Sequence, residues 1–395
     1  MKKLLIMIAL SMGVISAKTM HYKEIIARVK EQHPQFLAKE QMRLSLEAKS
    51  QADTATSALS LAANIANASP NVGDDAVEYS VGISKNIALG NTRQLSLNAK
   101  RLANEAKMLE REKRLIELGN TLQNLYHQSC MDRAYRELLE ESLSSYEVLY
   151  VKKQKAYKFH EVSKKELLQL DMQMRTLRQK AQSVRAKERI SKERLQDLGM
   201  IEESVTLSCE DMAPIVAEIG VGDKAFSLSH KAFEKSLLSL DTLYARYDRA
   251  FESIDLGASY DDELDTKRIG VGFVLPLSFS SQRNEQSRIV LLHQKELKKL
   301  ARQNWLIEQK SELKRLRSEL KNSYEAIGLT QGNVQEYEHT LMPLIEKSFR
   351  YGESSSLEYI FGRQKLLELS QSLIEMKKNY YNTLFTLYST LEMEK

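Results

Sequence analysis

Apolar residues recur every seven positions along one stretch of the second half of the chain. They are Leu306, Leu313, Leu320, Ile327, Val334 and Leu341. A second row lies three residues further on, where its apolar members are Leu316, Tyr337 and Leu344. This spacing is typical of helices that pack side by side in coiled coils. Pro343 is expected to kink the helix because it lacks an N–H group and clashes with the preceding turn.

The first half carries the same stripe, formed by Leu95, Leu102, Leu109 and Ile116. The pattern predicts long helices over 93–156 and 283–349, each followed by a short break and a returning helix, over 164–198 and 356–393. At about 1.5 Å per residue, some sixty helical residues make a rod of roughly 90 to 100 Å. No single globular core contains such a rod, so the helices must belong to a bundle or to a multi-chain barrel.

Short segments before each long helix alternate in character with period two. In the last of them, the apolar residues Val271, Phe273, Leu275, Leu277 and Phe279 alternate with Gly270, Gly272, Val274, Pro276 and Ser278. Period two predicts a β-strand with one apolar face, and about a dozen residues exceed the roughly 9–11 that a tilted transmembrane strand needs. Pro276 removes one ladder donor and favours an end or edge position. The alternative is a small soluble hairpin inserted in a helical rod.

Four such strands are predicted, in two pairs that each surround an acidic loop. The strands cover 58–68, 77–89, 253–260 and 268–279, and amphipathic helices over 20–54 and 223–249 precede the pairs. The loops contain Asp74 and Asp75 in the first pair and Asp261, Asp262 and Glu263 in the second. Closed membrane barrels start near eight strands, and an open sheet edge would leave unpaired backbone groups in hydrocarbon. If these strands cross a membrane, several chains must share one barrel.

The order of these features is written twice, which indicates a tandem duplication. Val81-Gly82-Ile83 recurs as Val271-Gly272-Phe273, and Lys158-Phe159-His160-Glu161 resembles Arg350-Tyr351-Gly352-Glu353 at nearly the same offset. Pro214, Gly220 and Gly222 interrupt helices between the two copies. The predicted organisation is a leader over 1–17, a first repeat over 18–210, a linker over 211–222 and a second repeat over 223–395.

The first residues have the pattern of a secretory signal peptide. Lys2 and Lys3 precede an apolar run over 4–15, and Ser16-Ala17 forms a small-residue cleavage site. The run is shorter than the ~20 residues of a transmembrane helix. We expect cleavage after Ala17, with an uncleaved anchor as the alternative, and no lipid attachment there because no cysteine follows. An exported chain meets an oxidising compartment, in which Cys130 and Cys209 either form a disulfide or remain two unpaired, partly buried thiols.

Composition narrows the function class. The chain has 395 residues, of which 42% are hydrophobic and 28% charged, with only 5 Pro and 15 Gly. It is too apolar for a disordered chain and too charged for a polytopic helical membrane protein. Loss of Lys2 and Lys3 with the leader would lower the net charge from +5 to +3, which is too weak to indicate nucleic-acid binding. The seven His residues are scattered, and His127 with Cys130 makes no complete metal site. We therefore expect no enzyme activity, no cofactor and no metal.

Three motifs together resemble the TolC family of outer-membrane efflux proteins. The first is Ile25-Ile26-Ala27-Arg28 leading to His33-Pro34-Gln35-Phe36, similar to the family's helix start. The second is the strand-to-helix passage over 270–277 followed by Arg283. The third is the run over 351–359, similar to the family's turn between long helices. Their order and duplication cover essentially the whole chain after the leader.

The resemblance implies a mainly α fold with a small β part. Three chains would contribute four strands each to one 12-stranded transmembrane β-barrel, and their helices would form a long antiparallel α-helical barrel, a coiled-coil tunnel through the periplasm. The implied function is an outer-membrane exit duct of a tripartite efflux or secretion system. The implied partners are a homotrimer, a periplasmic adaptor (membrane fusion protein), an inner-membrane pump of RND or ABC type and outer-membrane lipid, with no nucleic acid.

The resemblance also places candidate site residues at the turns between long helices. The periplasmic tips, which would contact the adaptor, consist of Phe159, His160, Glu161, Val162, Ser163, Tyr351, Gly352, Glu353, Ser354 and Ser355. The pore-entrance constriction would consist of Glu166, Phe349, Glu358 and Phe361. His160 stands where the family has a glycine, and Ser354 where some members have an arginine. A glutamate early in a helix is also explained by the helix dipole alone.

Two other function classes remain open from the sequence. One is a periplasmic adaptor or coiled-coil scaffold without a pore, and the other is a secreted coiled-coil surface protein. An adaptor would have one helical hairpin flanked by β-rich domains, whereas this chain has two hairpin-like halves. The sequence does not name the cargo, since drugs, metals and polypeptides all fit a wide duct.

Overall fold

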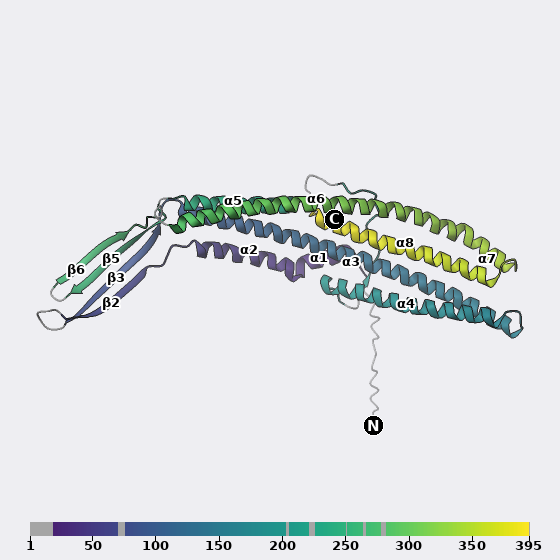
Figure 1. Cartoon of the computed structure of the whole chain (residues 1–395). Helices are drawn as coiled ribbons and strands as arrows, with labels where there is room; N and C mark the ends of the chain where they lie inside the picture. Colours follow the sequence, from purple (N-terminus) through teal and green to yellow (C-terminus); the bar gives the residue numbers. More distant parts are fainter. Residues whose placement is uncertain are drawn as a thin grey trace, which may run out of the picture. The chain divides into compact units, whose positions relative to one another are not determined.

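The computed structural model describes residues 19–69, 76–202, 205–220, 226–249, 251–263, 266–277 and 282–394. They form two compact units. One unit contains the described parts of Met1–Phe36, Ile116–Gly222 and Leu313–Lys395, and the other contains the described parts of Leu37–Leu115 and Asp223–Glu312. Figure 1 shows the elements in chain order. The predicted signal peptide and the loop with Asp74 and Asp75 lie outside the described residues.

The described residues of the first half form four helices. They are α1 (Tyr22–Gln32), α2 (Pro34–Asp53), α3 (Thr92–Lys158) and α4 (Lys164–Gly199). The single helix predicted over 20–54 is divided, because the residue before a proline avoids the helical region and His33 is extended with ψ 130°. The long helix and the returning helix have close to their predicted bounds. Among the described helices, none is both long and apolar enough to cross a bilayer.

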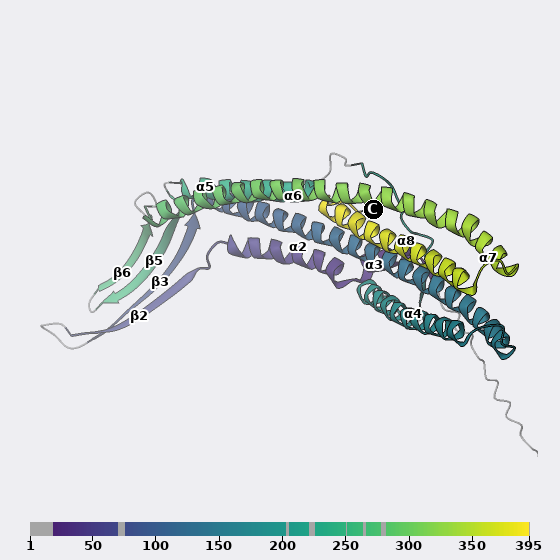
Figure 2. The ribbon, with the colours of Figure 1, turned by 45° about the vertical axis from the view of Figure 1, so that its right-hand side comes forward.

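The second half repeats this plan with one irregularity. Its helices are α5 (Ser227–Tyr247), α6 (Gln282–Glu336), α7 (Met342–Arg350) and α8 (Ser356–Thr390). A π-helical turn, Tyr337–Leu341, joins α6 to α7, whose second residue is Pro343. The predicted kink therefore takes the form of a wide turn, which accommodates a proline without a break in the helical path. In each repeat the returning helix lies beside the helix before it, α4 beside α3 and α8 beside α7 (Figure 2).

One antiparallel sheet contains the four long strands. They are β2 (Ser60–Ala68), β3 (Ala76–Ala88), β5 (Ser253–Glu263) and β6 (Thr266–Val274), in the order β2-β3-β5-β6. The acidic residues predicted as a loop are in fact the last three residues of β5. Asp261 pairs with Arg268 and Asp262 with Lys267, so opposite charges across the strands favour pairing there. β6 ends at Val274, two residues before Pro276, which cannot donate to a ladder.

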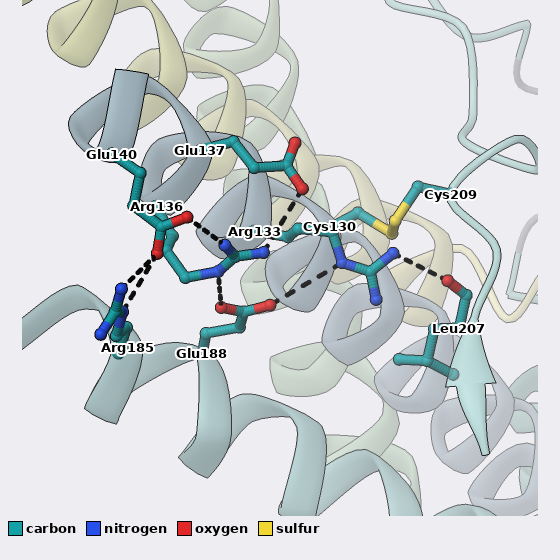
Figure 3. A network of polar contacts seen from close by, with 9 residues as sticks. All are labelled: Cys130, Arg133, Arg136, Glu137, Glu140, Arg185, Glu188, Leu207 and Cys209. Carbon is teal, nitrogen blue, oxygen red and sulfur yellow. Dashed lines mark hydrogen bonds and ion pairs between the residues drawn. A yellow bond between two sulfur atoms is a disulfide. The ribbon is translucent and has the colours of Figure 1, made fainter. Parts of the chain in front are cut away.

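A short strap over 205–216 crosses α3 in the first unit. It includes β4 (Thr206–Leu207), which pairs in parallel with β1 (Thr19–Met20). Cys209 in the strap forms a disulfide with Cys130 of α3, so the question that the sequence left open is answered by a bridge (Figure 3). The Tyr126 hydroxyl donates to the Ser208 carbonyl over 2.7 Å, and the Ala213 N–H donates to His127 Nε2 over 2.7 Å.

Next to the disulfide, an ion-pair network joins α3 to α4. Arg136 contacts Glu188 and Glu140 over 2.7 Å each, and Arg185 of α4 contacts Glu140 over 2.9 Å (Figure 3). The hydrogen bond from Arg185 lowers the pKa of Glu140 below its ordinary value. His127 is fully buried, where its ring packs against Tyr381 and Phe385. No group of metal-ligating side chains occurs among the described residues.

Candidate functional site

The two turns between long helices have the same backbone geometry. In the first, His160 has a φ of 61°, the Glu161 N–H donates to the Ala156 carbonyl over 3.1 Å, and the His160 N–H donates to the Tyr157 carbonyl over 3.0 Å. This pair of bonds is a Schellman motif, in which one residue after the helix adopts the left-handed conformation and satisfies the last carbonyls.

The second turn reproduces the motif in the other repeat. Gly352 has a φ of 77°, the Glu353 N–H donates to the Ser348 carbonyl over 2.9 Å, and the Gly352 N–H donates to the Phe349 carbonyl over 3.2 Å. His160 and Gly352 therefore hold equivalent left-handed positions. A histidine there is strained relative to glycine, which has no Cβ to clash with the backbone.

Both returning helices begin with the same cap. Ser163 accepts a hydrogen bond from the Glu166 N–H over 3.2 Å, and Ser355 accepts one from the Glu358 N–H over 3.2 Å. Glu358 completes a capping box by accepting from the Ser355 N–H over 2.9 Å. The Glu358 side chain thus stabilises its helix end directly, whereas Glu166 contributes its backbone N–H and a first-turn carboxylate that the helix dipole favours.

The aromatic residues at the turns differ in exposure. Phe159 is 75% exposed, Tyr351 72% and Phe361 63%. Phe349 instead stacks on Tyr359 with ring centroids 4.9 Å apart and packs against the hydrophobic cluster between the helices. Of the predicted constriction residues, Phe349 is therefore part of the helix packing within the chain, and Phe361 projects from it.

Three hydrogen bonds near the second turn were not predicted from the sequence. Arg363 of α8 donates to Glu346 of α7 over 2.9 Å and to the Tyr359 hydroxyl over 3.1 Å. The Tyr146 hydroxyl donates to the Ile360 carbonyl over 3.1 Å, and burial raises the pKa of Tyr146 to about 12. These bonds fix α8 against α7 and α3. No sequence signal distinguishes these residues from other charged or aromatic helix positions.

The sheet has two chemically distinct faces. Residues paired across antiparallel strands share a face, so the register Leu61–Ile83–Ala258–Val271 defines one of them. This mainly apolar face consists of Leu61, Ala63, Ile65, Asn67, Val77, Tyr79, Val81, Ile83, Lys85, Ile87, Ile254, Leu256, Ala258, Tyr260, Asp262, Lys267, Ile269, Val271 and Phe273. Val271 is 86% exposed and Ile269 83%. A water-exposed face of this composition is unusual in a soluble protein and needs a covering.

The opposite face is polar or small except for Val274, which pairs with Asp255 at the helical end of the sheet. It carries Ala62, Asn64, Glu78, Ser80, Gly82, Ser84, Asn86, Asp255, Gly257, Ser259, Asp261, Arg268, Gly270 and Gly272. Across it, the Asn86 side-chain amide donates to Asp255 over 2.7 Å. Alternation of an apolar outer and a polar inner face is the pattern of a membrane β-barrel.

The sheet ends in two strands that lack a second partner among the described residues, namely β2 and β6. One end of the sheet joins helices, because α2, α3, α5 and α6 lie directly before or after its strands. The other end carries the two hairpin turns. The edge helices α2 and α6 expose apolar side chains, which are Leu37, Leu44, Val290, Leu297, Leu300 and Ile307. The edge strands β2 and β6 thus lack a pairing strand on one side, and the helices next to them in the chain, α2 and α6, expose apolar side chains.

The chain matches solved outer-membrane channel structures over nearly all of its length. It aligns with the outer membrane protein VceC from Vibrio cholerae with a TM-score of 0.76 and 11% identity, over 94% of this chain and 96% of that one. For CusC, described for its transmembrane channel formation, the TM-score is 0.77 at 15% identity, over 95% and 92%. For the Campylobacter jejuni CmeC outer membrane channel it is 0.75 at 16% identity, over 94% and 85%.

No family model and no curated protein matches the sequence. The similarity is therefore one of structure, and the chain has the fold of these outer-membrane channel proteins. The fold class predicted from the motifs and the duplicated order of elements is confirmed.

Proposed function

We propose that the chain is the outer-membrane exit duct of a tripartite efflux or secretion system and carries out no chemical reaction. The observation that supports this most directly is the four-stranded sheet with one apolar face, one polar face and two unpaired edges. Such a sheet is stable in a bilayer only if other chains pair with its edges, because unpaired N–H and C=O groups in hydrocarbon are costly. The proposal places the sheet in the outer membrane and the helices in the periplasm.

Three chains provide the natural closure. Four strands from each would give a 12-stranded barrel with β6 of one chain beside β2 of the next, wide enough for a water-filled lumen lined by the polar face. The same operation would bring the exposed apolar side chains of α6 against those of α2. Closed cyclic symmetry satisfies every edge, which an open chain of copies does not.

A mass measurement tests this directly. We expect the protein to require detergent for extraction from the outer-membrane fraction and to elute as a trimer. The trimer mass should be three times that of the processed chain, which is the 45.3 kDa of the full chain less the mass of the cleaved leader. Light scattering corrected for bound detergent gives that mass. A monomer that stays soluble without detergent would refute the duct and support the alternative, a periplasmic adaptor or coiled-coil scaffold without a pore.

The helix turns are the proposed contact for a periplasmic adaptor, which would connect the duct to an inner-membrane pump of RND or ABC type. The exposed rings of Phe159 and Tyr351 supply apolar anchors of the kind that dominate protein interfaces. Glu166, Glu358 and Phe361 would lie at the entrance, with Phe349 supporting them from behind. Adaptor binding would shift the tip helices from a closed to an open population, after which substrate diffuses outward.

Substitution of Gly352 tests the role of the second tip. Gly352→Val should impair adaptor binding and export, because a β-branched residue at a φ of 77° costs on the order of 1–2 kcal/mol and displaces the turn. Export of a fluorescent pump substrate from cells and pull-down of the cognate adaptor both report the effect. The exposed helix position Lys310→Val serves as the control, and equal export by the two variants would contradict the assignment.

The equivalent turn of the first repeat provides the opposite change. His160→Gly should make the first turn less strained and leave export intact, because the φ of 61° suits glycine better than histidine. Loss of export by this variant would mean that the imidazole itself contacts the adaptor.

A further inference from the structure

The apolar face of the sheet carries one charged side chain away from its turn end, that of Lys85. Its neighbours along β3 on this face are Ile83 and Ile87, and its partner on β5 is Leu256. Lys85 is exposed, and none of the described residues forms an ion pair with it. A charge on a lipid-facing surface is disfavoured unless the side chain reaches water or a charged headgroup.

The position of Lys85 along the strand places it near one edge of that face. It lies three residues before Ala88, where β3 ends, and α3 begins at Thr92. Three residues at roughly 3.3 Å correspond to about 10 Å along the strand and, with a tilt of about 35–45°, to roughly 7–8 Å of depth. The four-carbon stem of lysine spans most of that depth, so its ammonium reaches the level of the lipid headgroups.

The charges at the other edge of the face satisfy one another. Asp262 accepts a hydrogen bond from the Tyr79 hydroxyl over 2.6 Å and from the Tyr260 hydroxyl over 3.3 Å, and it forms an ion pair with Lys267 over 3.8 Å. Two tyrosines at this level match the aromatic girdle that marks a membrane interface. At the turn end of this face, the charges of Asp262 and Lys267 thus neutralise each other. At the helical end, the charge of Lys85 has no acidic partner among the described residues.

We propose that the Lys85 ammonium binds the phosphate of a phospholipid in the leaflet on the helical side of the sheet, with the acyl chains lying on Ile83, Ile87 and Leu256. The site rests on the proposed function, since it requires this face to contact lipid. A shared barrel of three chains carries three such sites at one level. They fix the height of the barrel in the membrane from the helical side.

Lipid binding by the purified full-length protein tests the site. Native mass spectrometry with added phosphatidylglycerol gives the affinity of wild type, Lys85→Gln, Lys85→Arg and Lys267→Gln, the last being a lysine of the same face at the turn end. We expect Lys85→Gln to bind about fivefold more weakly, which corresponds to the ~1 kcal/mol of one lysine near a charged lipid surface. Lys85→Arg and Lys267→Gln should bind like wild type.

Two further probes separate the phosphate from the acyl chains. Diacylglycerol, which lacks phosphate, should bind all four proteins equally. Inorganic phosphate alone should not displace phosphatidylglycerol from the wild-type protein. Equal phosphatidylglycerol binding by wild type and Lys85→Gln overturns the site, as does an equal loss in Lys267→Gln. Failure of the proposed function is seen separately, as wild-type protein that is extracted without detergent and binds none of these lipids.

Discussion

Ile83→Arg should prevent stable insertion of the protein in a bilayer. Ile83 lies near the middle of the apolar face, between Leu61 and Ala258 in the register. An arginine at the bilayer midplane of a membrane β-barrel costs about 2–4 kcal/mol per site, and a trimer would contain three sites. We expect a large decrease in the yield of detergent-resistant trimer and in the denaturant midpoint of the remainder. Refolding into phospholipid vesicles followed by urea titration measures both.

The adjacent residue offers a matched control. Ser84 follows Ile83 on the same strand, and its side chain lies on the opposite, polar face. Ser84→Arg introduces the same charge at the same height and should leave the trimer stable while changing the conductance of the lumen. If Ile83→Arg and Ser84→Arg were equally tolerated, the apolar face would not contact lipid and the barrel would be refuted.

Removal of the disulfide is the second change with a large expected effect. Cys130 and Cys209 close a loop with a sequence separation of 79 residues. Replacing both by serine should lower the free energy of unfolding by about 2–4 kcal/mol, chiefly because the unfolded chain gains conformational freedom. Guanidinium titration of the double variant, followed by the signal of buried tyrosines, detects the lower midpoint.

The strap supplies the control for that experiment. Reduction of the wild-type protein should lower its midpoint by the same amount and leave the double variant unchanged. The strap also retains hydrogen bonds from Tyr126 and Arg133 to the carbonyls of Ser208 and Leu207. If reduction left the wild-type midpoint unchanged, these hydrogen bonds rather than the disulfide would fix the strap.

The two periplasmic tips show which features of a candidate site can be predicted from the sequence. The spacing of Ser163 and Glu166, repeated in Ser355 and Glu358, locates both turns because capping chemistry is local. The left-handed conformation of His160 could be inferred only from the match to Gly352, since histidine has no such preference of its own. The ion pair between Arg363 and Glu346 was not predicted, because it depends on how two helices face each other.

The sequence by itself determined the elements of this protein and their duplicated order. Periods of seven and of two are properties of side-chain spacing along a helix or strand, so α3 and β3 have nearly the bounds that the patterns predict. The helix predicted over 283–349 is instead divided into α6, a π-helical turn and α7. The predicted ends of an element are wrong where tertiary contacts determine its length. Asp261 and Asp262 join β5 because Arg268 and Lys267 face them across the sheet, a pairing that no local propensity contains.

Only the tertiary structure decided which residues far apart in the chain meet. The pairing of β3 with β5 joins the two repeats in one sheet and assigns Lys85 and Leu256 to the same face. The bridge between Cys130 and Cys209 likewise requires the strap to cross α3. The local pattern of residues determines whether a segment forms a helix or a strand. Contacts between residues far apart in the chain depend on the free energy of packing the whole chain, and local spacing does not give that free energy.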